Sequence, residues 1–565
     1  MNTKGAIRRI GLINLLLKCK NCKKEFLITD DDIAYYDEIK VPAPTFCPAC
    51  RQKRRLIWRN ERTLYKRKCS ATGAEIISVY SPDKPFPVYE NNYWFSPQWD
   101  ALKYGRDFDF NRPFFEQFEE LMNSVPQLAR SAVGNQNCDY TNQCGWCKNC
   151  YLIFEADFNE NCYYSNNIYD SKQTMDCLMV IKCELCYECI NCENCYGLKY
   201  SQNCVNCADS WFLKNCIGCK NCFGCVNLRN KEYFFLNEKC SKDDYSQKVA
   251  NTNLNTNLEL ETAHKNFTEF CRKFPNKYME GIQNEDSTGD YLSHTQRCLN
   301  CFDVNNSQDC KYVFNSRMMK KCYDITVFGS IKWSEYCYEN HEVGYGVRNV
   351  HFSDQVWTDC YDILYSKSCI NGSHNLLGCC GFQHMDHAIF NKKYSKEEYE
   401  KLHAKIIEHM KKTGEFGEFF PGQMAYYGYN ETIAQDYFPL SKEQALAEGY
   451  KWKDTDEKEY KPQTYKIPER IKEVPDDILT KILACVNCEK NYKIVEEELK
   501  FYRRMNLPVP VKCPDCRHKP RFNMRNTRNL YKRTCQKCGT EIETTYPPED
   551  TKIVYCEKCY VQAVD

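Results

Sequence analysis

The stretch that decides the fold runs from Cys138 to Leu228, and its centre reads Cys183-Glu184-Leu185-Cys186-Tyr187-Glu188-Cys189-Ile190-Asn191-Cys192-Glu193-Asn194-Cys195. It holds 17 cysteines, and together with Cys240 all 18 stand at positions divisible by three. The other positions of this phase up to Leu228 are neither charged nor aromatic. A helix repeats every ~3.6 residues and a plain strand every ~2. The period of three therefore indicates a different architecture.

A period of three predicts a narrow β-solenoid, in which short coils turn every third side chain inward. Such a coil has room inside only for small side chains, which matches the Cys, Ser, Thr, Ala and Val of this phase. Asn precedes many of the cysteines, as at Asn149, and Asn tolerates the left-handed backbone that corners need. We interpret the spacing of these corners as the coil length. It predicts coils as long as the interval from Cys150 to Cys162, and others as long as the wider interval from Cys207 to Cys222.

The repeated cysteines allow three interpretations. A metal or iron–sulfur cluster is one, and disulfides, which need an oxidising compartment, are another. The third is that a buried Cys serves as a small hydrophobic side chain. Because Ser and Thr replace Cys in the same phase, we favour packing inside the solenoid.

Length and composition exclude some classes of protein. The chain has 565 residues, enough for several domains, and a net charge of +1, so it is not a polycation. The weak apolar run near the start is interrupted by Asn14 and leads into Cys19 without a cleavage site, which argues against a signal peptide. No window reaches the length of a membrane span. Cysteine pairs of the zinc type without an export signal predict a cytoplasmic protein.

Pairs of cysteines near both ends predict zinc sites. Two Cys-x-x-Cys pairs separated by 24 residues occur in each half, and all four ligands share an offset of 466 residues. Four thiolates give the closed tetrahedral site of structural zinc. Because the second pair opens a helix in each copy, we predict treble-clef fingers. The ligand sets are Cys19, Cys22, Cys47 and Cys50, and Cys485, Cys488, Cys513 and Cys516.

The C-terminal copy continues into a third predicted zinc site, formed by Cys535, Cys538, Cys556 and Cys559. At the same offset the N-terminal copy keeps only Cys69, and Thr72, Glu90 and Tyr93 stand in place of the other ligands. The joint loss of three ligands indicates that the C-terminal four act as one site. We therefore expect three structural zinc ions, and Cys69 is interpreted as a relic.

The solenoid pattern recurs in a second module. Cys147 and Cys150 reappear as Cys298 and Cys301, and the phase of three later slips to a new frame. Ser241 and Ser395 are predicted to cap helices over 242–273 and 396–412, which could cover the open solenoid ends. The sequence thus predicts a multidomain, mainly β chain: an N-terminal treble-clef zinc finger (1–70), an aromatic connecting segment (71–135), β-solenoid module 1 (136–240), a helical connector (241–285), β-solenoid module 2 (286–393), a helix and linker (394–480), a second treble-clef finger (481–533) and a C-terminal zinc ribbon (534–565).

Several motifs carry a resemblance to known proteins. The run Pro42-Ala43-Pro44-Thr45-Phe46-Cys47-Pro48-Ala49-Cys50-Arg51, followed by Arg59-Asn60-Glu61-Arg62, resembles the probable treble-clef zinc-ribbon family. Nearly the whole chain resembles large cysteine-rich zinc-ribbon proteins of candidate-phyla-radiation (Patescibacteria) bacteria, as in the stretches 104–110, 223–230 and 429–432. The resemblance implies zinc sites and leaves the biological role open.

Basic tracts follow the second cysteine pair in both fingers. Aromatic residues are interleaved with them, which suits phosphate contacts combined with base stacking. The candidate nucleic-acid contacts are Arg51, Lys53, Arg54, Arg55, Arg59, Arg62, Lys66, Arg67, Arg517, Lys519, Arg521, Arg525, Arg528, Lys532 and Arg533. We therefore hypothesise that the solenoid is a rigid spacer holding two basic heads that grip RNA, the ribosome or DNA.

Other functions fit the same sequence. The basic tracts could instead be solvated helix faces or could dock onto acidic parts of the same chain, and a protein-assembly scaffold is the main alternative to nucleic-acid binding. Metal storage and thiol redox chemistry come next. We do not expect an enzyme, because no phosphate loop or nucleophile motif is present. The close pair His384 and His387 is interpreted as part of a surface loop.

Overall fold

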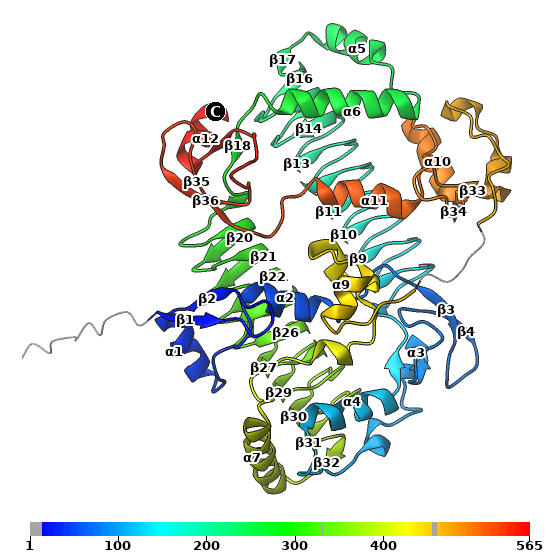
Figure 1. Cartoon of the computed structure of the whole chain (residues 1–565). Helices are drawn as coiled ribbons and strands as arrows, with labels where there is room; N and C mark the ends of the chain where they lie inside the picture. Colours follow the sequence, from blue (N-terminus) through cyan, green and yellow to red (C-terminus); the bar gives the residue numbers. More distant parts are fainter. Residues whose placement is uncertain (1–13, 330, 455–459, 565) are drawn as a thin grey trace, which may run out of the picture. The chain divides into compact units, whose positions relative to one another are not determined.

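The computed structural model describes residues 14–329, 331–454 and 460–564 (Figure 1). The chain divides into two units, each made from two separate stretches of sequence. Unit 1 contains the residues up to Ala129 together with Glu280–Lys453, and unit 2 contains Arg130–Met279 together with the residues from Asp454 onward. Each solenoid module therefore shares a unit with the finger from the opposite end of the chain.

Module 1, in unit 2, is a β-solenoid whose strands form one 11-stranded sheet in sequence order. Neighbouring coils pair in parallel, and Asn166 lies between Phe154 and Leu178, so successive coils repeat at a constant interval. The strands are β7 (Ala132–Val133), β8 (Asn142–Gly145), β9 (Phe154–Asp157), β10 (Asn166–Tyr169), β11 (Leu178–Ile181), β12 (Ile190–Glu193), β13 (Gln202–Val205), β14 (Trp211–Lys214), β15 (Lys220–Val226), β16 (Glu232–Phe235) and β17 (Glu238–Lys239). The predicted solenoid is confirmed.

The corners have the backbone that the sequence predicted. Asn149 and Asn161 adopt φ of 53° and 54°, in the left-handed region, and residues of this kind recur at every third position. The following residue points inward, and Cys150 and Cys162 are fully buried in the core of the module. A corner at every third residue gives a coil with four short sides. This explains why the inward positions share one phase.

Module 2, in unit 1, varies its coil length within a 14-stranded sheet. Its strands are β19 (Gly281–Ile282), β20 (Gly289–Gln296), β21 (Cys301–Gln308), β22 (Phe314–Arg317), β23 (Met319–Lys320), β24 (Tyr323–Phe328), β25 (Ser334–Glu335), β26 (Tyr338–Val343), β27 (Arg348–His351), β28 (Asp354–Val356), β29 (Tyr361–Leu364), β30 (His374–Leu377), β31 (Asp386–Ile389) and β32 (Lys392–Lys393). The interval from Tyr323 to its partner Tyr338 is a multiple of three, whereas the interval from Tyr361 to its partner His374 is not. A coil of the second kind shifts the phase, which explains the slip seen in the sequence.

The prediction of a longer coil from Cys207 to Cys222 is wrong. In module 1, Ala208 pairs with Lys220, so that coil is as long as the one from Cys150 to Cys162. Cys219 lies one coil beyond Cys207, whose Sγ accepts the backbone N–H of Cys219 at 3.4 Å. Cys222 occupies the next side of the same coil as Cys219. Every side of a coil can carry an inward Cys, so the distance between two Asn-Cys corners does not measure the coil.

Helices follow both modules as predicted, with one correction. Ser241 caps α5 (Lys242–Asn251) and Ser395 caps α7 (Lys396–Thr413), each by accepting a backbone N–H from the third helical residue. The predicted helix over 242–273 is interrupted, because Thr256 caps a separate helix, α6 (Asn257–Cys271). α5 contacts β16 and α7 contacts β31, near the ends of their modules.

The remaining elements complete the two units. Unit 1 also contains β1 (Leu15–Lys18), β2 (Glu25–Ile28), α1 (Asp30–Glu38), α2 (Pro48–Leu56), β3 (Tyr65–Lys68), β4 (Glu75–Ser78), β5 (Val88–Tyr89), α3 (Asn91–Trp94), α4 (Phe114–Ser124), β6 (Gln127–Leu128), α8 (Ala434–Tyr437) and α9 (Lys442–Ala447). Unit 2 also contains β18 (Asn276–Lys277), β33 (Leu483–Ala484), β34 (Asn491–Tyr492), α10 (Glu496–Met505), α11 (Pro514–Asn523), β35 (Tyr531–Thr534), β36 (Glu541–Thr544), β37 (Val554–Tyr555) and α12 (Glu557–Val564). Within the described ranges, no helix has the length and apolar character needed to cross a membrane.

Candidate metal centres and docking of the finger helices

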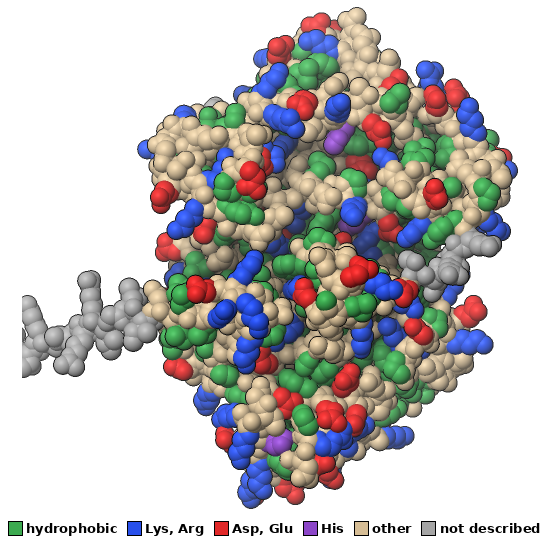
Figure 2. All heavy atoms as spheres, viewed as in Figure 1, with side chains coloured by type: hydrophobic (Ala, Val, Ile, Leu, Met, Phe, Trp, Pro, Cys, Tyr) green, Lys and Arg blue, Asp and Glu red, His purple; other side chains and the backbone are tan. Residues whose placement is uncertain are grey.

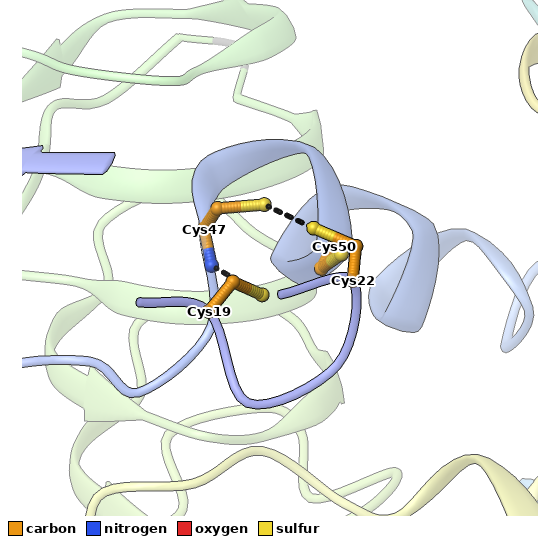
Figure 3. A group of neighbouring side chains, drawn as sticks. All are labelled: Cys19, Cys22, Cys47 and Cys50. Atoms are coloured by element: carbon orange, nitrogen blue, oxygen red, sulfur yellow. Dashed lines mark hydrogen bonds between the residues drawn. The ribbon is translucent and has the colours of Figure 1, made fainter. Parts of the chain in front are cut away.

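The first cysteine tetrad lies between a hairpin turn and a helix start (Figure 3). β1 and β2 pair up to Lys18 and Glu25, so the turn that joins them carries Cys19 and Cys22. Cys47 is the residue before α2, and Cys50 follows in its first turn. The Pro at the first helical position costs no hydrogen bond there. A turn and a helix start thus bring together two cysteine pairs that are well separated in sequence.

The geometry of this tetrad fits a tetrahedral metal ion. The four ligand atoms lie within 4.8 Å of one another. Sγ of Cys22 is 3.7 Å from Sγ of Cys47, close to the ~3.8 Å expected for sulfurs around a tetrahedral zinc. The backbone N–H of Cys47 donates to Sγ of Cys19 at 3.2 Å. The hydrogen bond between Cys47 and Cys50 lowers the pKa of the Cys50 thiol to about 5 and raises the pKa of the Cys47 thiol.

The two C-terminal tetrads have the same arrangement. Cys485, Cys488, Cys513 and Cys516 form one, and Cys535, Cys538, Cys556 and Cys559 form the other, each with its ligand atoms within 4.8 Å. One sulfur pair in each tetrad, Cys488–Cys513 and Cys538–Cys556, is 3.7 Å apart. The structure therefore brings together all 12 predicted ligands in the predicted three groups.

Cys69 stands 466 residues before Cys535, at the position equivalent to a ligand of the third tetrad. Its Sγ accepts the backbone N–H of Glu90 at 3.4 Å. Burial raises the pKa of the Cys69 thiol, but hydrogen bonds from Thr72 and from backbone groups outweigh this effect and lower it overall. No group of three metal-ligating side chains forms around Cys69 within the described part of the chain.

Comparison with known proteins supports the finger assignment. Residues 15–58 match the family of the probable treble clef domain. This segment is a treble-clef finger. A search of the curated proteins finds none that matches this chain. The second finger follows from the internal repeat, because its ligands and its helix stand 466 residues after those of the first.

The arginines of the first finger lie against module 2, within unit 1. Arg51 contacts Asp324 at 2.8 Å, and Arg55 contacts the other oxygen of the same carboxylate at 3.2 Å. Arg54 pairs with Glu339 at 2.5 Å. All of these side chains are buried, with relative exposures of 7% or less. Arg59 extends the series by pairing with Glu342 of the same module at 2.5 Å.

The second finger repeats this arrangement on module 1, within unit 2. Arg517 and Arg521, the equivalents of Arg51 and Arg55, contact the two oxygens of Asp176 at 3.3 and 2.9 Å. Arg521 also contacts Glu188 at 2.7 Å. Burial raises the pKa of Glu188 to about 7, although the charge of Arg521 opposes this shift. The two fingers thus form equivalent ion pairs with the two modules.

The spacing of a helix explains how the finger fits the solenoid. The paired arginines are four positions apart, or about one turn of ~5.4 Å. Asp176 and Glu188 occupy equivalent corners of adjacent coils, because Met175 pairs with Tyr187, and adjacent coils lie ~4.8 Å apart. Asp324 and Glu339 are related in the same way by the pairing of Tyr323 with Tyr338. One turn of the finger helix therefore covers about the same distance as the spacing between adjacent coils.

These contacts correct the prediction of basic nucleic-acid-binding heads for six residues. Arg51, Arg54, Arg55, Arg59, Arg517 and Arg521 are buried in ion pairs with carboxylates of their own unit and cannot reach a phosphate. The physical reason is that acidic corners of the solenoid neutralise them. Of the other predicted contacts, Lys53, Arg62, Arg67, Arg525, Arg528 and Arg533 are half-buried, and Lys66, Lys519 and Lys532 are exposed.

The cysteines inside the solenoid act as small packing groups with a weak donor. Sγ of Cys192 donates to the carbonyls of Ile190 and Ser201 at 3.4 and 3.6 Å. Ser201, in the same phase, donates its hydroxyl to the carbonyl of Lys199 at 3.0 Å. Within the described residues, the groups with three or more ligand atoms inside 4.8 Å are the three finger tetrads. The geometry thus favours the packing interpretation over a cluster.

His387 lies at a solenoid corner within β31 rather than in the predicted surface loop, and its Nδ1 shares a hydrogen bond of 2.9 Å with Asp386. The acidic corners Asp176, Glu188 and Asp324 were not among the residues predicted from the sequence. They could have been found from the sequence, because each is a carboxylate at a corner between inward-facing Cys or apolar residues. Such a carboxylate needs a partner when another element covers it.

Proposed function

We propose that this protein is a cytoplasmic, non-enzymatic scaffold for protein assembly, in which three structural zinc ions stabilise fingers that clamp the solenoid. One observation carries the proposal. The arginines best placed to bind a polyanion are already paired with carboxylates of the solenoid in both units. A finger whose arginines are occupied in this contact helps to hold its unit together and does not offer them to a polyanion.

The tetrads support a structural role for zinc. Each would supply four protein thiolates, which closes the coordination sphere and leaves no position for a substrate. Zinc is favoured over harder ions because thiolates are soft ligands. The residues that would hold it are the 12 finger cysteines, and its contribution would be to fix the start of α2 and α11.

The solenoid surface supports a protein partner more than a nucleic acid. Glu160 lies between Lys148 and Lys172 on three adjacent coils, at 3.9 and 3.8 Å, so charges alternate along this column. On the face shown in Figure 2, basic and acidic side chains are interspersed. A phosphate backbone would meet a carboxylate at every second coil of such a column, which opposes binding.

Nucleic-acid binding is the second candidate, and one observation favours it. Lys66 and Lys532 are exposed at equivalent positions of the β3–β4 and β35–β36 hairpins. These lysines, unlike the buried arginines, are free to approach phosphates.

A titration distinguishes the two candidates. Wild type and the variant Lys66→Ala/Lys532→Ala are titrated with RNA and duplex DNA at about 50 and 200 mM salt, the range over which phosphate contacts weaken strongly. If the protein is a scaffold for protein assembly, wild type should show no saturable, salt-dependent binding to RNA or DNA. Binding that falls with salt and is lost in the lysine variant would put nucleic acid ahead. Glu25→Gln, on the β1–β2 hairpin, serves as the control for surface substitution.

A further inference from the structure

Unit 1 contains a groove that the metal sites and the finger contacts do not use. It lies between a column of module 2 corners, the face of α7 and the end of α1. Its volume is about 770 Å³, within the range of ~300–1,000 Å³ typical of small-molecule sites. The corner column contributes Asn349, Asp362 and Asn375 on successive coils.

His351 lines this groove and carries one ring nitrogen that can accept a hydrogen bond. The residue is 8% exposed, and its Nε2 lies 3.0 Å from the carbonyl oxygen of Tyr336. Because a carbonyl only accepts, Nε2 carries the proton and Nδ1 keeps its lone pair. The described residues give Nδ1 no partner. Burial lowers the pKa of His351 to about 4, so the ring stays neutral near pH 7.

Asp362 adds a carboxylate beside this acceptor. Its Oδ1 accepts from Nδ2 of Asn349 at 2.9 Å, and no cationic side chain among the described residues pairs with it. The other acids of the groove are already neutralised, since Glu408 pairs with Lys411 at 2.6 Å and Glu38 with Lys321 at 2.8 Å. The carbonyl end of α1 adds partial negative charge. Lys40 and Lys411 also line the groove, and both are exposed, so solvent screens their charges.

The remaining wall carries apolar side chains beside Lys411, whose Nζ lies 5.7 Å from the centre of the Phe416 ring. Leu364 lies on the solenoid side, Ile407 and Tyr399 come from α7, and Phe416 follows α7. Leu364, Ile407 and Phe416 are half-buried, so they offer apolar surface that a ligand would remove from water. A ligand that fits this groove would carry a hydrogen-bond donor at one end and an apolar surface at the other.

We propose that the groove binds a small protonated amine that carries an apolar body. The ammonium group donates to the carboxylate of Asp362 and to Nδ1 of His351, and the body packs against Leu364 and Phe416. A carboxylate ligand is disfavoured at this end of the groove, because both groups would face it with lone pairs. This site does not depend on the proposed scaffold function.

Isothermal titration calorimetry of the full zinc-loaded chain tests the proposal with three probes of similar shape. These are 2-phenylethylamine, 2-phenylethanol and 3-phenylpropionate. We expect the amine to bind about ten- to a hundredfold more tightly than the other two, which is the range of one charge-assisted hydrogen bond. Equal binding of the three probes, or no binding of the amine, overturns the proposal.

Asp362→Asn tests the residue that carries the charge. The Asn side chain can still accept from Asn349, so we expect an unchanged melting temperature and a loss of at least about tenfold in affinity for the amine. Glu397→Gln, an exposed position of α7 outside the groove, is the matched control and should bind as wild type does. Unchanged affinity in Asp362→Asn contradicts the site.

Discussion

Asp176 and Asp324 each face two arginines that stand one helical turn apart on a finger. Charges buried in this way cost solvation, so the pairs contribute little net stability, but the loss of one partner leaves the other stranded. The value of the contact is therefore its specificity. A finger helix that is rotated or shifted along the solenoid would leave buried carboxylates without a partner.

Arg521→Met should destabilise unit 2 strongly. The substitution leaves Asp176 with only Arg517 and leaves Glu188 without its cation, and a broken buried pair costs about 3–5 kcal/mol. Thermal unfolding followed by calorimetry measures the effect. Lys519→Met, on the same helix but exposed, is the matched control and should change stability by less than about 0.5 kcal/mol. Equal melting temperatures for the two variants would show that the ion pairs do not hold the finger.

Inside the solenoid, the size and polarity of Cys192 should decide the outcome of substitution. Cys192→Lys buries an unpaired charge and should prevent folding of module 1. Cys192→Ser should be tolerated far better, because a hydroxyl can donate to the same carbonyl, as that of Ser201 does. Glu193→Gln, which is exposed, should be nearly silent. Circular dichroism and alkylation of native protein would measure these effects, and wild-type thiols that react quickly would contradict the packing account.

At the scale of elements, zinc binding and docking share one helix. Cys47 and Cys513 immediately precede α2 and α11, and the arginines follow within the same short helices. Metal binding at the first turn therefore fixes the position of the side chains that reach the solenoid. Because a four-thiolate site contributes folding free energy, loss of the metal should release the helix from its module.

Elemental analysis should find three zinc ions per chain, and Cys69→Ser should leave that number unchanged. The expectation rests on three tetrads of four thiols and on the absence of a fourth group around Cys69 within the described residues. Chelation should open α2 and α11 before the solenoid strands. Iron in place of zinc, or fewer zinc ions in Cys69→Ser, would contradict this account.

The solenoid was predictable because its signal is local and repeated. A corner at every third residue fixes which positions point inward, and the Asn residues before the cysteines mark those corners. The metal ligands were predictable for a similar reason, since each pair is close in sequence and the whole finger occurs twice. The coil length was harder, because all four sides of a coil can carry Cys.

The pairing of fingers with modules was not predictable from the chain order. Arg51 meets Asp324 across 273 residues, and Arg521 meets Asp176 across 345. Nothing in a basic tract shows whether its partner is a phosphate or a distant carboxylate, since both suit an arginine. The interpretation of the basic tracts as exposed heads failed for the six buried arginines. The alternative of docking onto acidic parts of the same chain holds for them, but the sequence did not show which carboxylates they would face.

At the scale of the whole molecule, both units use the same construction from segments at opposite ends of the sequence. Each finger docks on a module that is separated from it by hundreds of residues in the sequence. The fingers thus close each unit through contacts of long sequence separation. The central claim is that these fingers are internal clamps held by arginine–carboxylate pairs.

Hydrogen–deuterium exchange of the zinc-loaded chain tests this claim most directly, by comparing wild type with Asp324→Asn/Asp176→Asn. The clamp account predicts that the amides of α2, α11 and the facing coils exchange faster in the variant while three zinc ions stay bound. Lys66→Ala/Lys532→Ala, at exposed positions, should exchange as wild type does. Unchanged protection of α2 and α11 in the aspartate variant would contradict the account.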